Sequence, residues 1–127
     1  MIFLDTSFLI SFFVNKENDH ERALEVANKI KNEDKLISKS VIAETITILK
    51  KKLPTKDIIK IYDVLQDFII VEDSHLFNEA FKQFVIYDSE ISFFDSLYMV
   101  VMSELDIYYI VSFDSDFDNK DKIVRIY

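Results

Sequence analysis

The first five residues, Met1-Ile2-Phe3-Leu4-Asp5, place a carboxylate directly after a continuous apolar run. A run of this kind is typical of a short strand that is buried on both faces of a sheet. The stretch Tyr108-Tyr109-Ile110-Val111-Ser112-Phe113-Asp114 has the same form near the other end of the chain. We therefore predict buried strands over residues 1–4 and 107–111, each followed closely by an aspartate.

Between these two runs, helical and extended patterns of apolar residues follow one another. The predicted helices cover residues 7–14, 19–31, 40–52, 55–67, 74–85 and 93–104, and the further strands cover residues 36–37, 68–71 and 123–126. Ser40, Thr55 and Ser92 are the expected N-caps of the helices that begin beside them. Strands that alternate with helices predict a parallel sheet covered on both faces. We expect a single α/β domain over residues 1–127.

Four acidic residues stand where an isolated carboxylate is costly. They are Asp5 and Asp114 after predicted strands, Glu44 inside an apolar helix, and Asp95 at the start of another. Ligands of parallel sheets bind at the carboxyl ends of the strands, which is where Asp5 and Asp114 fall. A buried carboxylate without a partner is more stable protonated than charged. A divalent cation would explain several converging carboxylates, and Mg²⁺ and Mn²⁺ prefer hard oxygen ligands. The sequence therefore predicts a metal-dependent enzyme.

Each acid also has a simpler explanation, and the sequence leaves these alternatives open. Asp5 could cap the helix over residues 7–14, and the stretch 92–95 fits the Ser-x-x-Asp form of a capping box. The stretch 114–118, with three aspartates, could be an acidic turn. Glu44 is the hardest to explain in this way, because its helix is apolar nearly all round and is predicted to be buried. A carboxylate in that position needs a partner.

The composition excludes several classes of site. The chain has no cysteine, which rules out disulfides and thiolate metal sites, and two histidines are too few for a histidine-based zinc site. It has no glycine, which argues against a phosphate-binding loop of the Walker or dinucleotide type. No apolar run approaches the roughly 20 residues that span a bilayer, and the N-terminus carries no basic leader. We expect no membrane association and a cytoplasmic location.

The net charge of −8 by itself argues against a nucleic-acid binder, which usually has a basic face. Acids that surround a metal contribute to this total, so the bulk charge overstates the repulsion. The basic cluster comprises Lys50, Lys51, Lys52, Lys56 and Lys60. These lysines could form a solvated helix end or a patch that contacts phosphates, and the sequence does not decide between the two.

Four short motifs resemble those of the PIN domain family. They are Phe3-Leu4-Asp5-Thr6-Ser7, Ser40-Val41-Ile42-Ala43-Glu44, Phe94-Asp95-Ser96-Leu97-Tyr98 and Val111-Ser112-Phe113-Asp114-Ser115-Asp116-Phe117. Each motif is weak alone, but their order and spacing along the whole chain are fairly specific. In size and motif order the chain is similar to the toxin nuclease of VapBC-type toxin–antitoxin pairs.

The resemblance implies a three-layer α/β/α sandwich with an acidic pocket for Mg²⁺ or Mn²⁺, and hydrolysis of RNA phosphodiesters. The family's four acids map to Asp5, Glu44, Asp95 and Asp114, a further acid maps to Asp116, and nearby hydroxyl positions map to Thr6 and Ser112. Asp5, Asp95, Asp114 and Asp116 are the expected metal ligands, with Glu44 as a ligand or a base. Where many members have asparagine, this chain has Ser7. The expected partners are an RNA substrate, a small antitoxin protein and a second copy of the chain.

Two other functions fit part of the pattern. A haloacid-dehalogenase-like phosphatase also begins with an acid after its first strand, but its chemistry usually needs a second aspartate two residues later, where this chain has Ser7. A PIN-like scaffold that binds RNA or protein without cutting would need no metal. The presence of all four acids argues against a decayed site.

Overall fold

The computed structural model describes residues 1–120 and 122–127, and within these it contains one five-stranded sheet in the order β3-β2-β1-β4-β5. Every neighbouring pair of strands is parallel. The strands are β1 (Ile2–Leu4), β2 (Lys35–Ser38), β3 (Ile69–Val71), β4 (Tyr109–Val111) and β5 (Val124–Ile126). The predicted parallel sheet is therefore confirmed.

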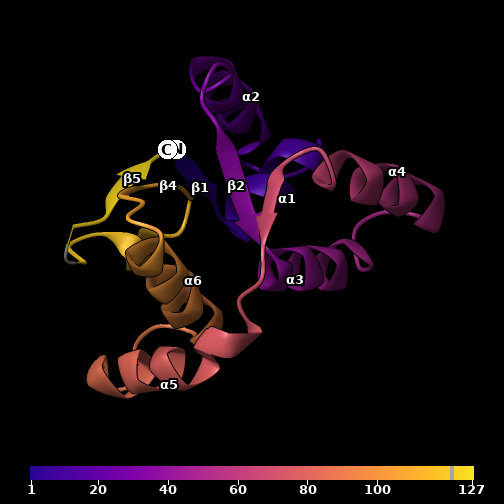
Figure 1. The fold of residues 1–127 in the computed structure, drawn as a ribbon. Helices are drawn as coiled ribbons and strands as arrows, with labels where there is room; N and C mark the ends of the chain where they lie inside the picture. Colours follow the sequence, from indigo (N-terminus) through magenta and orange to yellow (C-terminus); the bar gives the residue numbers. More distant parts are fainter. Residues whose placement is uncertain (121) are drawn as a thin grey trace.

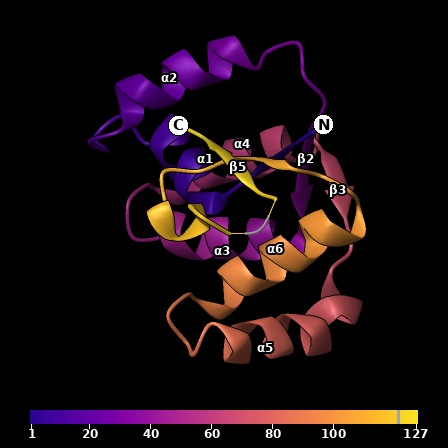
Figure 2. The ribbon, with the colours of Figure 1, turned by 90° about the vertical axis from the view of Figure 1, so that its left-hand side faces the viewer.

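Helices cover both faces of the sheet, in an α/β/α sandwich (Figures 1 and 2). They are α1 (Thr6–Phe13), α2 (His20–Lys29), α3 (Lys39–Leu49), α4 (Thr55–Leu65), α5 (Phe77–Ile86) and α6 (Phe93–Glu104), with short 3₁₀ turns at Ser74–Leu76 and Ser115–Phe117. The helices α1 to α4 lie on one side of the sheet, and α5 and α6 lie on the other. None of the helices in the described ranges has the length and apolar character needed to cross a membrane.

The strand order creates a crevice at the middle of the sheet. From β1 the chain moves outward to β2 and β3, and then returns across the other face to β4 and β5. Ligands of open parallel sheets bind at such a reversal, outside the carboxyl ends of the strands. The register sets Leu4 beside Val111, and the Asp5 backbone N–H donates to the Val111 carbonyl at 3.0 Å. The residues that follow β1 and β4 are therefore neighbours.

Two of the three expected helix caps are wrong. The N-cap of α3 is Ser38, whose Oγ accepts from the Val41 N–H at 3.4 Å, so the helix begins earlier than Ser40. At α4, Pro54 occupies the cap position and Thr55 is the first helical residue. The third expectation is confirmed, because the Ser92 Oγ accepts from the Asp95 N–H at 3.0 Å.

The core extends over both faces of the sheet, with buried apolar residues from the strands and from α1, α2, α3, α4 and α6. Phe3 of β1 is fully buried and packs against Tyr98 of α6, with ring centroids 5.4 Å apart. The prediction that α3 is buried all round is wrong, because Ala43 and Thr47 are exposed. One face of α3 packs on α1 and β2 and a second faces solvent, which leaves Glu44 half-buried between them.

Candidate active site

A cleft of about 670 Å³ opens at the carboxyl ends of β1 and β4. The expected site residues that line it are Asp5, Thr6, Glu44, Asp95, Asp114 and Asp116, and the buried Ser112 lies directly behind it. A second cavity, of about 550 Å³, lies between α5, α6 and the start of β4, and none of these acids lines it. Residues from both ends of the chain thus come together in one acidic cleft.

Asp5 is held by two serine hydroxyls rather than by a helix end. The Ser112 Oγ donates to Asp5 Oδ2 at 2.7 Å, and the Ser7 Oγ donates to the same oxygen at 2.8 Å. Asp5 occupies the N-cap position of α1, but its side chain makes no capping hydrogen bond. Burial raises the pKa of Asp5 to about 6, although the bonds from Ser112 and Ser7 oppose the rise. Asp5 therefore takes the N-cap position of α1, as the capping explanation expects, but its carboxylate is held by the two serines and makes no capping bond.

The same two serines also fix the loop that follows β4. The Ser112 Oγ accepts from the Asp114 N–H at 3.0 Å, and the Ser7 Oγ accepts from the Phe113 N–H at 3.0 Å. Each hydroxyl therefore joins Asp5 to the backbone beside Asp114. Sequence reasoning did not predict this role of Ser7, which it noted only as a replacement for residues that other families have at this position. The available signal was a hydroxyl two residues after an acid that ends a strand.

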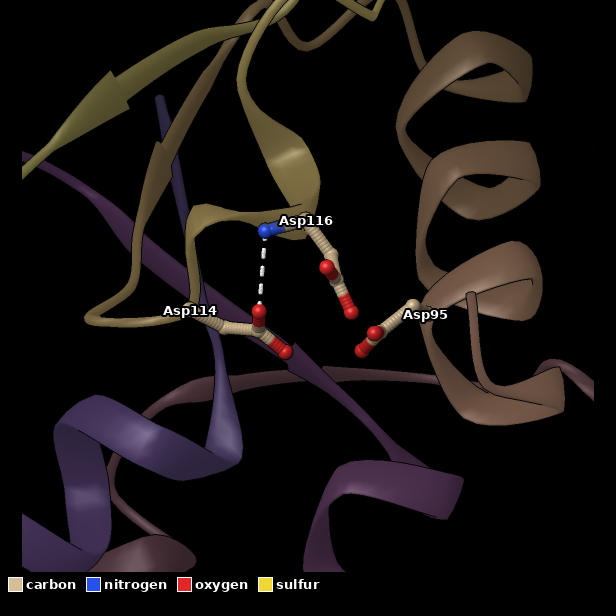
Figure 3. Close-up of side chains that lie close together, drawn as sticks. All are labelled: Asp95, Asp114 and Asp116. Carbon is tan, nitrogen blue, oxygen red and sulfur yellow. Dashed lines mark hydrogen bonds between the residues drawn. The ribbon is translucent and has the colours of Figure 1, made fainter. Parts of the chain in front are cut away.

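Three carboxylates converge across the cleft. Asp95, Asp114 and Asp116 each offer an oxygen, and these oxygens all lie within 4.8 Å of one another. Figure 3 shows Asp95 on the first turn of α6, facing Asp114 and Asp116 from the loop after β4. The Asp114 Oδ1 accepts from the Asp116 N–H at 2.9 Å, which sets the spacing of these two side chains.

Asp95 is more than a capping residue. Its backbone N–H donates to the Ser92 Oγ, but among the described residues the Ser92 N–H donates no hydrogen bond to the Asp95 carboxylate, so only half of the capping box forms. Burial, together with the charges of Asp5, Asp114 and Glu44, raises the pKa of Asp95 to about 8. This clustering of carboxylates is costly unless a cation or a proton compensates the charge. The donor set consists of hard carboxylate oxygens and therefore fits Mg²⁺ or Mn²⁺.

Glu44 has the partner that its position requires. The Tyr98 Oη donates to Glu44 Oε1 at 2.9 Å. Tyr98 is fully buried, and burial together with the charge of Glu44 raises the pKa of the phenol well above its usual range. The tyrosine therefore stays protonated and remains a donor. From sequence, Tyr98 stands out only as part of the motif that begins at Phe94, and the bond to Glu44 is not predicted.

Thr6 completes the wall between α1 and α3. Its hydroxyl is buried and accepts from the Thr45 Oγ1 at 3.4 Å. Asp5 and Glu44 lie on this side of the cleft, and their oxygens are not part of the tight group formed by Asp95, Asp114 and Asp116. Of the four expected metal ligands, the structure therefore brings three close together and sets Asp5 beside them.

Comparisons with known proteins agree with this architecture. The sequence model of the PIN domain family matches residues 2–123. VapC20 of Mycobacterium tuberculosis, a toxin that cleaves the sarcin–ricin loop, superposes with a TM-score of 0.83 at 23% identity, over 91% of this chain and 92% of that one. A search of the curated proteins found no match.

Two toxin–antitoxin structures are also similar. A toxin–antitoxin complex from Klebsiella pneumoniae gives a TM-score of 0.73 at 18% identity, over 98% of this chain and 96% of that one. VapBC2 of Rickettsia felis, bound to a fragment of its promoter DNA, gives 0.71 at 17% identity, over 99% of this chain and 98% of that one. At these identities the likeness establishes the fold.

Proposed function

Because the chain belongs to the PIN domain family, we propose that it is a divalent-metal-dependent endoribonuclease and the toxin of a toxin–antitoxin pair. The observation that carries the proposal is the convergence of Asp95, Asp114 and Asp116, whose oxygens lie within 4.8 Å of one another beside Asp5. Hard oxygen donors gathered in this way suit Mg²⁺ or Mn²⁺. A nuclease that acts on cellular RNA would work in the cytoplasm.

The acids divide the chemistry between them. Asp95, Asp114 and Asp116 would hold the ion, with Asp5 at the margin of the group. Once bound, a divalent ion lowers the pKa of coordinated water and offsets charge that develops on the phosphate. Asp5 is kept in place by Ser7 and Ser112, so its carboxylate needs no rearrangement when RNA arrives.

We infer that Glu44 is the general base. Tyr98 hydrogen-bonds one of its oxygens and orients the carboxylate, and the side chain lines the cleft. In hydrolysis the water oxygen forms a bond to phosphorus, its proton passes to Glu44, and the bond from phosphorus to the leaving ribose oxygen breaks. That ribose oxygen then takes a proton from solvent. A base held within reach of the attacking water contributes about 10²- to 10⁴-fold to such reactions.

Two protein partners belong to the proposal. The solved relatives from Klebsiella pneumoniae and Rickettsia felis are toxin–antitoxin assemblies, which supports a small antitoxin for this chain. Such an inhibitor would place a basic side chain against the acids, since the cleft is strongly negative without metal. The second partner is another copy of the chain, because α5 exposes Phe77, Phe81 and Val85 on its surface. Contiguous exposed apolar side chains of this kind mark interaction surfaces.

The alternatives have less support. Ser7 stands where a haloacid-dehalogenase-like phosphatase usually needs its second aspartate, and its hydroxyl serves Asp5 and the Phe113 backbone instead. A non-catalytic scaffold would have no use for three carboxylates held at this spacing, which is costly without a cation.

The proposal is tested by incubating mixed RNA with the purified protein and magnesium, with and without a chelator. We expect cleavage that the chelator abolishes, and loss of cleavage in Asp5→Asn and Asp95→Asn variants that remain folded by circular dichroism. Asp63→Asn is the matched control, because Asp63 is an exposed aspartate of α4 that does not line the cleft. Full cleavage by a folded Asp95→Asn protein would contradict the assignment.

A further inference from the structure

The proposed nuclease leaves open how an acidic protein holds RNA. Of the described residues that line the cleft, seven are acidic and one, Lys52, is basic. A bound divalent ion would offset only part of the acidic charge. The remaining carboxylates of the cleft would still repel the phosphates that flank the cut site. Phosphate contacts from lysine and arginine supply most of the affinity for nucleic acids. Among the described residues that line the cleft, Lys52 is therefore the side chain that can make such a contact with a phosphate.

Lys52 lies at the far end of a groove between α1 and α3. Glu44 and Ile48 share one face of α3. Lys52 lies in the turn that follows the helix, and all three residues line the cleft. The opposite wall is formed by Ile10 and Ser11 of α1, which packs on α3. At helical rise, α3 spans about 7.5 Å along its axis from Glu44 to its end at Leu49, and Lys52 lies three residues further on. A phosphate at Lys52 would thus belong to a nucleotide near, but not at, the cut site.

In the free protein, the ammonium group of Lys52 already forms an ion pair within the chain. Its Nζ pairs with the Glu17 carboxylate from the loop after α1. Both side chains remain partly exposed, with 37% of Lys52 and 27% of Glu17 accessible. Ion pairs at such positions contribute little to stability, so an arriving phosphate can displace Glu17 at small cost. Glu17 therefore competes with the substrate for the same ammonium group.

We propose that the α1–α3 groove carries the single-stranded RNA segment beside the cleaved bond, that Lys52 contacts its phosphate, and that Glu17 is the internal competitor. This inference rests on the proposed nuclease function and gives it a substrate-positioning residue. It also separates Lys52 from its neighbours Lys50 and Lys51, which are exposed and do not line the cleft.

The test is the binding of a short fluorescein-labelled single-stranded RNA of mixed sequence, followed by fluorescence anisotropy over a range of salt concentrations. Calcium replaces magnesium to slow hydrolysis, and a gel checks that the RNA stays intact. Lys52→Ala should raise Kd by about threefold at low salt and reduce the slope of log Kd against log salt by about 0.7, the value for one contact with a single strand. The matched control, Lys51→Ala, makes the same charge change outside the cleft and should keep wild-type values.

A second pair of variants tests the competitor. Glu17→Gln and Asp19→Asn each remove one negative charge from the cleft lining, but only Glu17 is paired with Lys52. Glu17→Gln should tighten RNA binding more than Asp19→Asn does, and this difference should vanish when both are combined with Lys52→Ala. Melting temperatures should stay close to wild type in all variants, because an exposed ion pair adds little stability.

Equal effects of Lys51→Ala and Lys52→Ala, or no effect of either, would overturn the proposal, since binding would then depend on general charge or on another surface. Equal effects of Glu17→Gln and Asp19→Asn would overturn the role of Glu17. Cleavage of the same RNA with magnesium is scored separately. If the wild-type protein binds this RNA through Lys52 but does not cut it, the nuclease proposal fails and the Lys52 contact stands.

Discussion

At the scale of single residues, Asp95 is the carboxylate of the cleft whose ionisation is most strongly opposed by its surroundings. It is buried, and the carboxylates of Asp5, Asp114 and Glu44 surround it, which raises its pKa to about 8. Without a cation, protonation relieves this repulsion. The protonation state of Asp95 therefore depends on whether a cation is bound in the cleft.

This shift makes the stability of the metal-free protein depend on pH. The folded state keeps the Asp95 proton up to about pH 8, whereas the unfolded chain loses it near its ordinary pKa of 3.8. Between these values the folded state binds more protons, so the free energy of unfolding falls as the pH rises. In chelator, the melting temperature of the wild type should therefore decrease from about pH 5 to about pH 8.

The variant Asp95→Asn should flatten most of this decrease, and it should melt at a higher temperature than the wild type at about pH 8. A smaller decrease should remain below about pH 6, because the pKa of Asp5 is also raised, to about 6. Asp63→Asn, on the exposed face of α4, should keep the wild-type profile. A wild-type melting temperature that rises over this range would contradict the assignment of Asp95.

The residues found from sequence and those missed differ in where their partners lie. Asp5 and Asp114 stand out because each follows an apolar strand, which is a local signal. Ser7 and Tyr98 acquire their roles from partners far along the chain, Ser7 from the Phe113 backbone and Tyr98 from Glu44. The sequence therefore predicts the carboxylates, and the family resemblance adds Ser112, but the bonds of Ser7 to Phe113 and of Tyr98 to Glu44 depend on pairings far apart in the chain.

At the scale of elements, β5 anchors the loop that carries the acids. The Arg125 guanidinium donates to both oxygens of Asp118, at 2.7 and 2.8 Å, and to the Ser112 carbonyl at 3.2 Å. These bonds lower the pKa of Asp118 and raise that of Arg125. Arg125 thus holds both ends of the loop that carries Asp114 and Asp116, through the Ser112 carbonyl before it and the Asp118 carboxylate after it.

Arg125→Lys should loosen this loop while keeping the charge, because lysine cannot form the two-pronged bond. We expect magnesium affinity, measured by calorimetry, to fall by roughly tenfold, which is typical when a group that orients metal ligands is lost. Arg22→Lys is the control for the same exchange outside the cleft, since Arg22 pairs with Glu25 and donates to the Tyr127 carbonyl but does not line the cleft. Unchanged magnesium affinity in Arg125→Lys would show that the loop holds its shape without β5.

The elements themselves follow largely from apolar periodicity, but their ends do not. Ser38 and Ser40 are both good capping residues, and the choice of Ser38 depends on tertiary structure, because the Ser40 N–H bonds to Asp73 far along the chain. The pattern of α3 predicts a buried helix, yet α3 lies at one side of the sandwich with Ala43 and Thr47 exposed. Periodicity reports which residues are apolar and not how many neighbours a helix has.

At the scale of the whole molecule, α5 is the outermost helix on its side of the sheet (Figure 1). Its surface exposes Phe77, Phe81 and Val85. Phe81 on α5 is 58% exposed, and Ile59 on α4 is 59% exposed, so the two are matched in accessibility. Light scattering should give the mass of a dimer for the wild type and for Ile59→Glu, but that of a monomer for Phe81→Glu. A wild-type monomer, or a Phe81→Glu dimer, would contradict an interface on α5.

The central claim is that the converging carboxylates form a specific divalent-metal site, and the melting temperature with and without metal tests it most directly. A ligand that binds only the folded state at about a hundredfold excess over Kd stabilises it by roughly 2.7 kcal/mol. For a domain of this size that corresponds to a rise of several degrees. Magnesium or manganese should therefore raise the melting temperature of the wild type well above the effect of sodium at matched ionic strength, and Asp95→Asn should lose most of this rise. Equal shifts from magnesium and matched sodium would reduce the effect to charge screening and would contradict the metal site and the hydrolytic mechanism built on it.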